Sequence, residues 1–186
     1  MNFVSHLRPV ALAALVVIAH SAQSATLDLV PSTVLAPLGA SFSLDVNGND
    51  FAGNIIGGGF NFSYDPLRLQ YDGLVIDTTV WPDPARSAGL HDPASGTVTG
   101  VFFNNISAIL PTGSFHVARL SFTSLSSLPS TVQLAGNPGL VWGNELAEEV
   151  AVNYGLAQIN PVPEPGTWAL MVAGMAMVGA RRLRKS

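Results

Sequence analysis

The chain has 186 residues, no cysteine and a formal net charge of −4. Without cysteine, disulfides, thiol catalysis and cysteine-based zinc sites are excluded. Between residues 26 and 160, eleven acidic residues stand against three arginines and no lysine, which gives this part a net charge of −8. Because phosphate binding needs a basic face, this composition excludes nucleic acid as a partner.

The first 25 residues have the pattern of a secretory signal peptide. Arg8 gives a basic start, residues 10–19 form an apolar run, and residues 22–25 are the small residues of a cleavage region. The alternative is a retained first transmembrane helix, which the early end of the run at His20 disfavours. We therefore expect export, with cleavage near Ser24 or Ala25.

Residues 26–160 are long enough for one domain with its own core. Apolar residues recur there at every second position and never at helical spacing over three turns, which predicts an all-β domain. The expected strands are residues 26–30, 41–46, 60–64, 67–76, 97–104, 114–123, 130–135, 150–152 and 155–159. That number of short strands predicts an antiparallel sandwich of two sheets.

The segments between these strands carry turn and loop residues. Residues 47–50, Asn-Gly-Asn-Asp, predict a turn, and the three glycines at 57–59 predict a flexible link. Residues 79–96 contain Pro82, Pro84 and Pro93 and are expected to form a long surface loop. For residues 145–152 a single helical turn is left open.

Two stretches of the domain resemble a known family. Residues 37–46 lead from a glycine-containing turn into a strand, and residues 62–69 read Phe-x-Tyr-Asp-Pro-x-x-Leu. With the late segment 113–122, they are similar to cohesin domains and their relatives among carbohydrate-binding modules. The resemblance implies a jelly-roll-like sandwich that binds carbohydrate or protein. No motif for a particular partner accompanies it.

Catalytic patterns are sparse in the domain. No serine lies in a Gly-x-Ser-x-Gly elbow, and only two histidines remain. His116 is in phase with the inward residues of its strand and is expected to be partly buried, and His91 lies in the proline-rich loop. Acid pairs such as Asp72 with Asp77, or residues 145, 148 and 149, leave a glycan-active enzyme as a third interpretation.

Two further sets of residues are candidates for binding. Trp81 and Trp142 are the candidate glycan contacts, with the alternative that each covers an end of the core. Asn47, Asn49 and Asp50 offer oxygen ligands for Ca²⁺ in a glycine-containing turn, but they lack the spacing of an EF-hand. We expect no other metal and no organic cofactor.

The last 25 residues, from Val162 to Ser186, have three parts. Val162, Pro163, Glu164 and Pro165 precede an uncharged run over residues 166–180, which as a helix would span about 22 Å, short of the roughly 30 Å of a hydrocarbon core. The end carries basic residues that favour the cytoplasmic side of a membrane: Arg181, Arg182, Arg184 and Lys185.

This order of triplet, short apolar helix and basic end resembles the PEP-CTERM sorting signal of Gram-negative bacteria. The resemblance implies that an exosortase, a membrane-bound cysteine protease-like enzyme, recognises the tail, removes it and passes the protein to the cell surface or beyond. The alternative is an ordinary membrane anchor with a proline-rich stem.

The expected organisation is a signal peptide over residues 1–25, a β-sandwich domain over 26–160 and a sorting signal over 161–186. We predict an exported, non-enzymatic protein of the surface or extracellular matrix, associated with exopolysaccharide or biofilm after transient anchoring in the inner membrane. The alternative is a carbohydrate- or protein-binding module. The expected partners are an exosortase, the inner membrane, and an exopolysaccharide or a surface protein.

Overall fold

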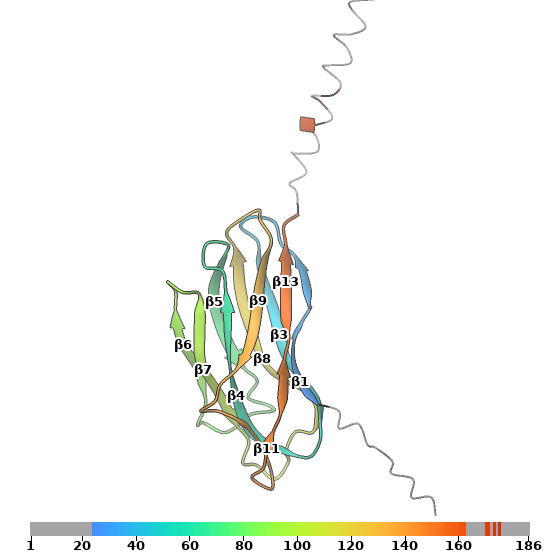
Figure 1. Cartoon of the computed structure of the whole chain (residues 1–186), viewed down its shortest axis with the longest axis vertical. Coiled ribbons are helices and arrows are strands. Elements are labelled where there is room, and N and C mark those ends of the chain that lie inside the picture. Colours follow the sequence, from blue (N-terminus) through green and yellow to red (C-terminus); the bar gives the residue numbers. More distant parts are fainter. Residues whose placement is uncertain (1–23, 163–169, 172, 174, 176–186) are drawn as a thin grey trace, which may run out of the picture.

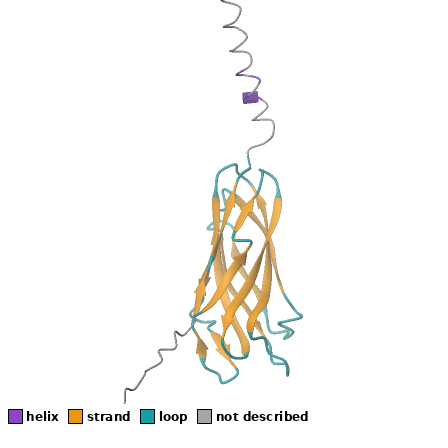
Figure 2. Ribbon diagram, turned by 90° about the vertical axis from the view of Figure 1, so that its right-hand side faces the viewer, coloured by secondary structure: helices purple, strands orange, loops and turns teal. Residues whose placement is uncertain are grey.

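The computed structural model describes residues 24–162 and, beyond them, residues 170, 171, 173 and 175. The strands form two layers that run along the length of the molecule (Figure 1, Figure 2). They are β1 (Ala25–Val30), β2 (Thr33–Leu35), β3 (Ser41–Phe51), β4 (Ile55–Tyr64), β5 (Leu69–Ile76), β6 (Ser87–Asp92), β7 (Thr97–Asn104), β8 (Gly113–Ser124), β9 (Ser130–Gly136), β10 (Trp142–Asn144), β11 (Glu149–Val150), β12 (Val152–Tyr154) and β13 (Leu156–Asn160).

The two layers confirm the predicted two-sheet sandwich. One sheet has the order β12-β1-β3-β8-β5 and is called sheet A here; the other, sheet B, has the order β11-β10-β4-β9-β13-β2, with β7 beside β4 and β6 beside β7. Most pairs are antiparallel, but β1 with β12 and β2 with β13 are parallel. The predicted antiparallel sandwich is confirmed, and these two short parallel pairs occur where the last segment of the chain pairs with the first, β12 in sheet A and β13 in sheet B.

The core lies between the two sheets. Phe60, Phe62 and Tyr64 of β4 point inward at alternate positions, and Phe122 of β8 meets them from sheet A, with its ring 6.4 Å from that of Phe62. Burying each large apolar side chain contributes roughly 1.5 to 3 kcal/mol. The predicted strand over residues 60–64 is therefore confirmed as a central strand.

The three glycines at 57–59 form part of β4, so the prediction of a flexible link is wrong. A Cβ atom on Gly58 would lie 2.5 Å from Cδ2 of Trp142. On the neighbouring positions, a Cβ on Gly57 would lie 2.5 Å from Oδ1 of Asn104, and one on Gly59 would lie 2.7 Å from Cβ of Leu140. Glycine is needed here because other parts of the chain approach this strand closely on both faces.

Two other loop predictions are also wrong. Residues 47–50 continue β3 instead of turning, because Gly48 and Phe51 both face inward and pair with Phe115 and Gly113 of β8. Residues 87–92 form β6, which pairs with β7, because the prolines of this segment stand only before and after that strand. The open question at 145–152 is answered by a hairpin of β10 and β11, with no helical turn.

The connecting segments gather at the two ends of the sandwich (Figure 2). At one end lie residues 31–40, which include the short strand β2, together with residues 65–68 and 125–129, and the chain leaves the domain there after β13 (Figure 1). At the other end lie residues 52–54, 77–86, 105–112 and 137–148. Each end is therefore built from segments that are far apart in the sequence.

Within the residues that the structure describes, no helix has both the length and the apolar character needed to cross a membrane. The predicted signal peptide lies almost entirely outside those residues, as does most of the predicted short C-terminal helix. Leu170, Met171, Ala173 and Met175 are helical and exposed.

Replacement of Gly58 by alanine is expected to lower the free energy of unfolding by about 1 to 3 kcal/mol, because the added methyl group overlaps the Trp142 ring. Urea denaturation measures the change. Gly139→Ala is the matched control, since its nearest neighbour would be 3.5 Å away, and it should leave stability unchanged or raise it by less than about 1 kcal/mol. Equal midpoints for the two variants would contradict this packing.

Candidate interaction face

A groove of about 400 Å³ lies on the outer face of sheet B. It is lined by Ile56, Gly57, Gly58, Phe102, Asn104, Gly139, Leu140, Val141 and Gly143. The glycines of β4 form its floor, since they carry no side chain above the backbone. The groove therefore combines a flat floor of backbone with walls that are mostly apolar.

The sequence brings these walls together in two ways. Phe102 is paired with Gly59 across the β4–β7 ladder, so its ring stands next to a position without a side chain. On the other side, the segment 137–141 crosses the outer face of β4 and is held there by Asn137, whose Nδ2 donates to Oδ1 of Asn61 at 3.1 Å. Asn61 also accepts a hydrogen bond from the Gly100 amide at 2.8 Å, which joins β4, β7 and this segment.

Two of the residues that line the groove are open to solvent. Val141 is half exposed and Ile56 is also exposed, whereas Phe102 and Leu140 are partly buried. Partners bind best to apolar side chains that are held in place before binding, because little side-chain entropy is then lost. This groove has that property, since its wall is fixed by the Asn137–Asn61 hydrogen bond.

Trp81 and Trp142 lie in the core, so their prediction as exposed glycan contacts is wrong. Their side chains are 0% and 1% exposed, and their rings meet edge to face at 6.3 Å. Phe103 contacts both rings, at 4.5 Å and 5.1 Å. The alternative in which each tryptophan covers an end of the core agrees with this packing. Trp81 Nε1 donates to the His116 carbonyl, and Trp142 Nε1 has no hydrogen-bond partner among the described residues.

His116 is partly buried, as predicted, but it lies on the outer face of sheet A and out of phase with the inward residues of β8. The ladder between β3 and β8 shifts at Val117, because Val46 pairs with Ala118 while Asn47 pairs with His116. This extra residue reverses the alternation before it, so Val117 is buried and His116 faces solvent in part. Its Nδ1 lies 2.9 Å from Oδ2 of Asp77, and its Nε2 lies 3.4 Å from Oδ1 of Asp45.

The carboxylates around His116 are stabilised in their charged form. A hydrogen bond from Arg119 lowers the pKa of Asp45 from its ordinary value, against the opposing effect of burial. Burial raises the pKa of Asp77, but hydrogen bonds from Thr79 and His116 outweigh it, so this pKa is also lowered. Asp45, Asp77, His116 and Arg119 thus form one polar cluster on the outer face of sheet A.

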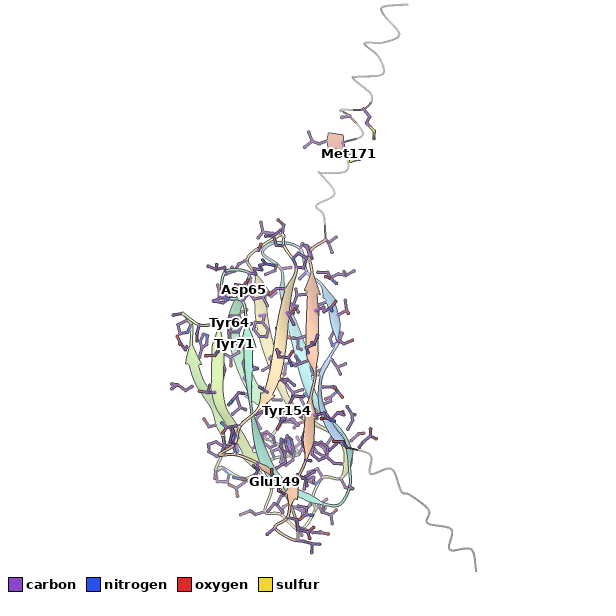
Figure 3. All side chains as sticks on the ribbon, in the orientation of Figure 1. Tyr64, Asp65, Tyr71, Glu149, Tyr154 and Met171 are labelled. Carbon is purple, nitrogen blue, oxygen red and sulfur yellow. The ribbon has the colours of Figure 1, made fainter. Side chains whose placement is uncertain are left out.

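The second histidine lies in strand β6 instead of a loop. His91 Nε2 is 2.6 Å from the Tyr64 hydroxyl, and its ring contacts Tyr71 at 4.8 Å between centroids. Tyr64 and Tyr71 lie near each other in Figure 3, at the edge between the sheets. Burial raises the pKa of Tyr71 to about 12, so both rings act as packing groups and neither phenol is readily ionised.

The proposed calcium ligands belong to β3. Asn49 donates from Nδ2 to Oδ2 of Asp28 at 3.1 Å, and Asp50 is exposed with a φ of 59°. In the described part of the chain, no group of three or more histidines and acids is arranged to hold a metal ion. Calcium binding at Asn47, Asn49 and Asp50 stays a prediction.

The acids considered for glycan hydrolysis accept hydrogen bonds from other side chains of the domain. Asp72 accepts hydrogen bonds from Gln70 and Thr123, whereas Asp77 contacts His116. Glu145 accepts from Asn54 and Glu148 accepts from Asn144. Of the sorting signal, only Val162 is described; Pro163, Glu164, Pro165 and the basic residues Arg181, Arg182, Arg184 and Lys185 lie outside the described residues.

Residues 161–185 match the model of the PEP-CTERM protein-sorting motif. The predicted sorting signal is therefore confirmed as a sequence motif at that position. It implies export and a membrane-anchored stage before sorting to the cell surface. A comparison with curated protein sequences finds no match.

The fold is similar to that of solved cohesin domains. The cohesin CaCohA2 from Clostridium acetobutylicum is 14% identical with a TM-score of 0.61, and the match covers 77% of this chain and 94% of that one. The sixth cohesin of scaffoldin B from Acetivibrio cellulolyticus, solved with a Cel5 dockerin, is 19% identical with a TM-score of 0.60, covering 75% and 100%. A non-cellulosomal cohesin from the archaeon Archaeoglobus fulgidus is 11% identical with a TM-score of 0.60, covering 79% and 97%.

At these identities the likeness defines the class of fold. The chain is an all-β, cohesin-like sandwich followed by a PEP-CTERM sorting motif. Both resemblances drawn from the sequence are confirmed at this level.

Acidification is expected to destabilise the domain through the cluster around His116. Because the pKa values of Asp45 and Asp77 are lowered in the folded state, their contribution is present above the unfolded pKa of about 3.9 and is lost as the pH falls through the folded values. The free energy of unfolding should therefore fall below about pH 4. The double variant Asp45→Asn, Asp77→Asn should show a shallower fall, and an identical pH slope in variant and wild type would contradict the role of this cluster.

Proposed function

We propose that this chain is an exported, non-catalytic module that an exosortase sorts to the cell surface, where it binds a protein partner through the groove on sheet B. The groove is the observation that carries the binding part of this proposal. It is the place on the domain where a flat glycine floor, an aromatic wall and exposed aliphatic side chains adjoin one another.

The shape and chemistry of the groove suit a protein partner. The central part of a protein interface is apolar, poor in charge and enriched in aromatic residues, with polar groups at its rim. Phe102, Leu140 and Val141 form such a centre, while Asn61 and Asn104 lie close by on β4 and β7. Carboxylates are missing from the lining of this groove although the domain as a whole is acidic.

The fold supports the same class of ligand. Cohesins from Acetivibrio cellulolyticus and Clostridium thermocellum were solved in complexes with dockerins. By analogy we propose a protein as the partner of this chain, with no particular dockerin implied. An exopolysaccharide is the alternative ligand, but the two tryptophans that motivated it are buried.

The sorting part rests on the motif at residues 161–185. We propose that the signal peptide over residues 1–25 exports the chain, that residues 166–180 hold it in the inner membrane for a time, and that an exosortase removes the tail near Pro163–Pro165. The mature module then reaches the surface or the extracellular matrix. An association with exopolysaccharide or biofilm would follow from this destination.

A non-catalytic role is favoured by the surroundings of the titratable groups. Both histidines of the domain are engaged with Tyr64 or with carboxylates, and the acids of the glycan-hydrolysis hypothesis have separate hydrogen-bond partners. No serine or carboxylate lines the groove on sheet B. The proposal therefore treats the domain as a binding surface.

A photo-cross-linking residue at Phe102 in the full chain, expressed in its native host, tests both parts of the proposal in one experiment. Ultraviolet illumination should produce one discrete protein adduct in the surface or secreted fraction. The intact mass of the same protein should lack residues 181–186 because the tail has been removed.

The matched control carries the same residue at Val75, which is 72% exposed on the outer face of sheet A. It should give no such adduct. Adducts of equal yield from both positions, or from neither, would contradict binding through the groove, and adducts with polysaccharide alone would favour the alternative ligand. An intact Arg181–Ser186 tail in the surface fraction would contradict sorting by removal of the tail.

A further inference from the structure

The end of the sandwich where the chain leaves β13 carries a group of exposed leucines. Their exposed fractions range from 46% to 84%. Isolated exposed leucines are ordinary, but five at one end of a domain form a surface that water solvates poorly. This leucine rim consists of Leu35, Leu38, Leu67, Leu125 and Leu128.

Backbone hydrogen bonds hold the segments of the leucine rim together. The Gly39 amide donates to the Ser124 carbonyl at 2.8 Å, and the Leu125 amide donates to the Arg68 carbonyl at 2.8 Å. The Ala36 amide donates to the Asn160 carbonyl at 2.9 Å, which joins the rim to the last residue of β13. The exposed leucines therefore belong to segments that are tied to one another and to the end of β13, where the chain leaves the domain.

Charge is distributed unequally between the two ends. In the segments of the leucine rim the only charged residues are Asp65 and Arg68, which form an ion pair at 2.9 Å, and the last residue of β6 adds Asp92. Figure 3 shows Asp65 at this end and Glu149 at the opposite one. The opposite end carries one arginine, Arg86, and six acids, namely Asp50, Asp77, Asp83, Glu145, Glu148 and Glu149.

The length of the connection limits how far the leucine rim can be from a membrane. Five residues, 161–165, separate β13 from the uncharged run that begins at Gly166, and three of them are proline. At about 3.1 to 3.4 Å per extended residue they span roughly 17 Å. The interfacial layer of a bilayer is itself about 5 to 8 Å deep on each side. A chain anchored by residues 166–180 thus holds the rim within reach of the lipid headgroups.

We propose that the leucine rim docks on the lipid bilayer while the C-terminal segment is still in the membrane. This inference rests on the membrane-anchored stage of the proposed function. The lipid surface is the occupant that the observations favour, because the rim is apolar, nearly free of unpaired charge and tethered within about 17 Å of the bilayer. The acidic end then points away from anionic headgroups, which repel it.

Docking of this kind depends on the tail. Leucines at an interface bind a membrane only marginally by themselves, as a single acyl chain does, but tethering raises their effective concentration at the surface. Removal of the tail therefore releases the domain. Until then, the docked rim holds residues 161–165 at the interface, where a membrane-bound protease acts.

The absence of cysteine makes a site-specific test straightforward. The full chain with Leu128→Cys is labelled with an environment-sensitive fluorophore and reconstituted into vesicles of phosphatidylethanolamine and phosphatidylglycerol that contain spin-labelled lipid. Quenching by the spin-labelled lipid is expected at this position. The control is Leu146→Cys, which is 71% exposed at the opposite end and should remain unquenched.

Replacing Leu67 and Leu125 by glutamine in the Leu128→Cys chain should reduce the quenched population on the order of tenfold, with the protein still floating with the vesicles. Thermal unfolding shows whether this variant folds; if it does not, the two single-cysteine chains decide the test.

An unquenched label at Leu128 in a floating chain would overturn the inference and leave the proposed function intact. Self-quenching between Leu128 labels that disappears on dilution with unlabelled chain would assign the rim to a second copy and also overturn it. A chain that does not float would overturn the membrane-anchored stage itself.

Discussion

The contact between Trp142 and Gly58 is the constraint on which the rest of one end of this domain depends. The indole ring occupies the space that the Cβ atom of any residue other than glycine would need at position 58. Such a Cβ atom would lie 2.5 Å from Cδ2 of Trp142. Because Trp142 can enter the core there, it joins Phe51, Phe103 and Trp81 in one aromatic cluster. The segment before it, residues 137–141, is thereby drawn across the outer face of β4. The same glycines thus permit a buried tryptophan on one face and a groove on the other.

This arrangement decides which functions the domain favours. A sugar-binding platform needs exposed aromatic rings, and here both tryptophans of the domain stabilise the core. What is exposed instead is a groove whose apolar wall is held by the hydrogen bond between Asn137 and Asn61. The two ends of the sandwich differ in charge, since one carries six acids and the other, beside the sorting motif, carries exposed leucines and few charged groups. Binding on a sheet face and orientation by one end are separate properties of the same fold.

The sequence was sufficient where a signal is local. Alternation predicted β7 with the bounds that the structure has, and the sorting motif could be recognised because it is linear. It was insufficient where a contact between distant residues overrides the local pattern. The residues next to Gly58 in the sequence give no sign that Trp142 packs against it, so the glycines indicated a flexible link. In β8, a single extra residue at Val117 places His116 on the outer face instead of the inner one. The groove could not be predicted, because it exists only when residues 137–141 cross a strand some eighty positions earlier in the chain.

The central claim is that this exported, cohesin-like module binds a protein through the outer face of sheet B. Hydrogen–deuterium exchange of the mature protein, with and without its cross-linked partner, tests this claim most directly because it reports on every strand at once. The account predicts slower exchange in residues 137–141 and along β7 in the complex, with sheet A unchanged. Protection confined to β1, β3 or β5, or no protection anywhere, would contradict it.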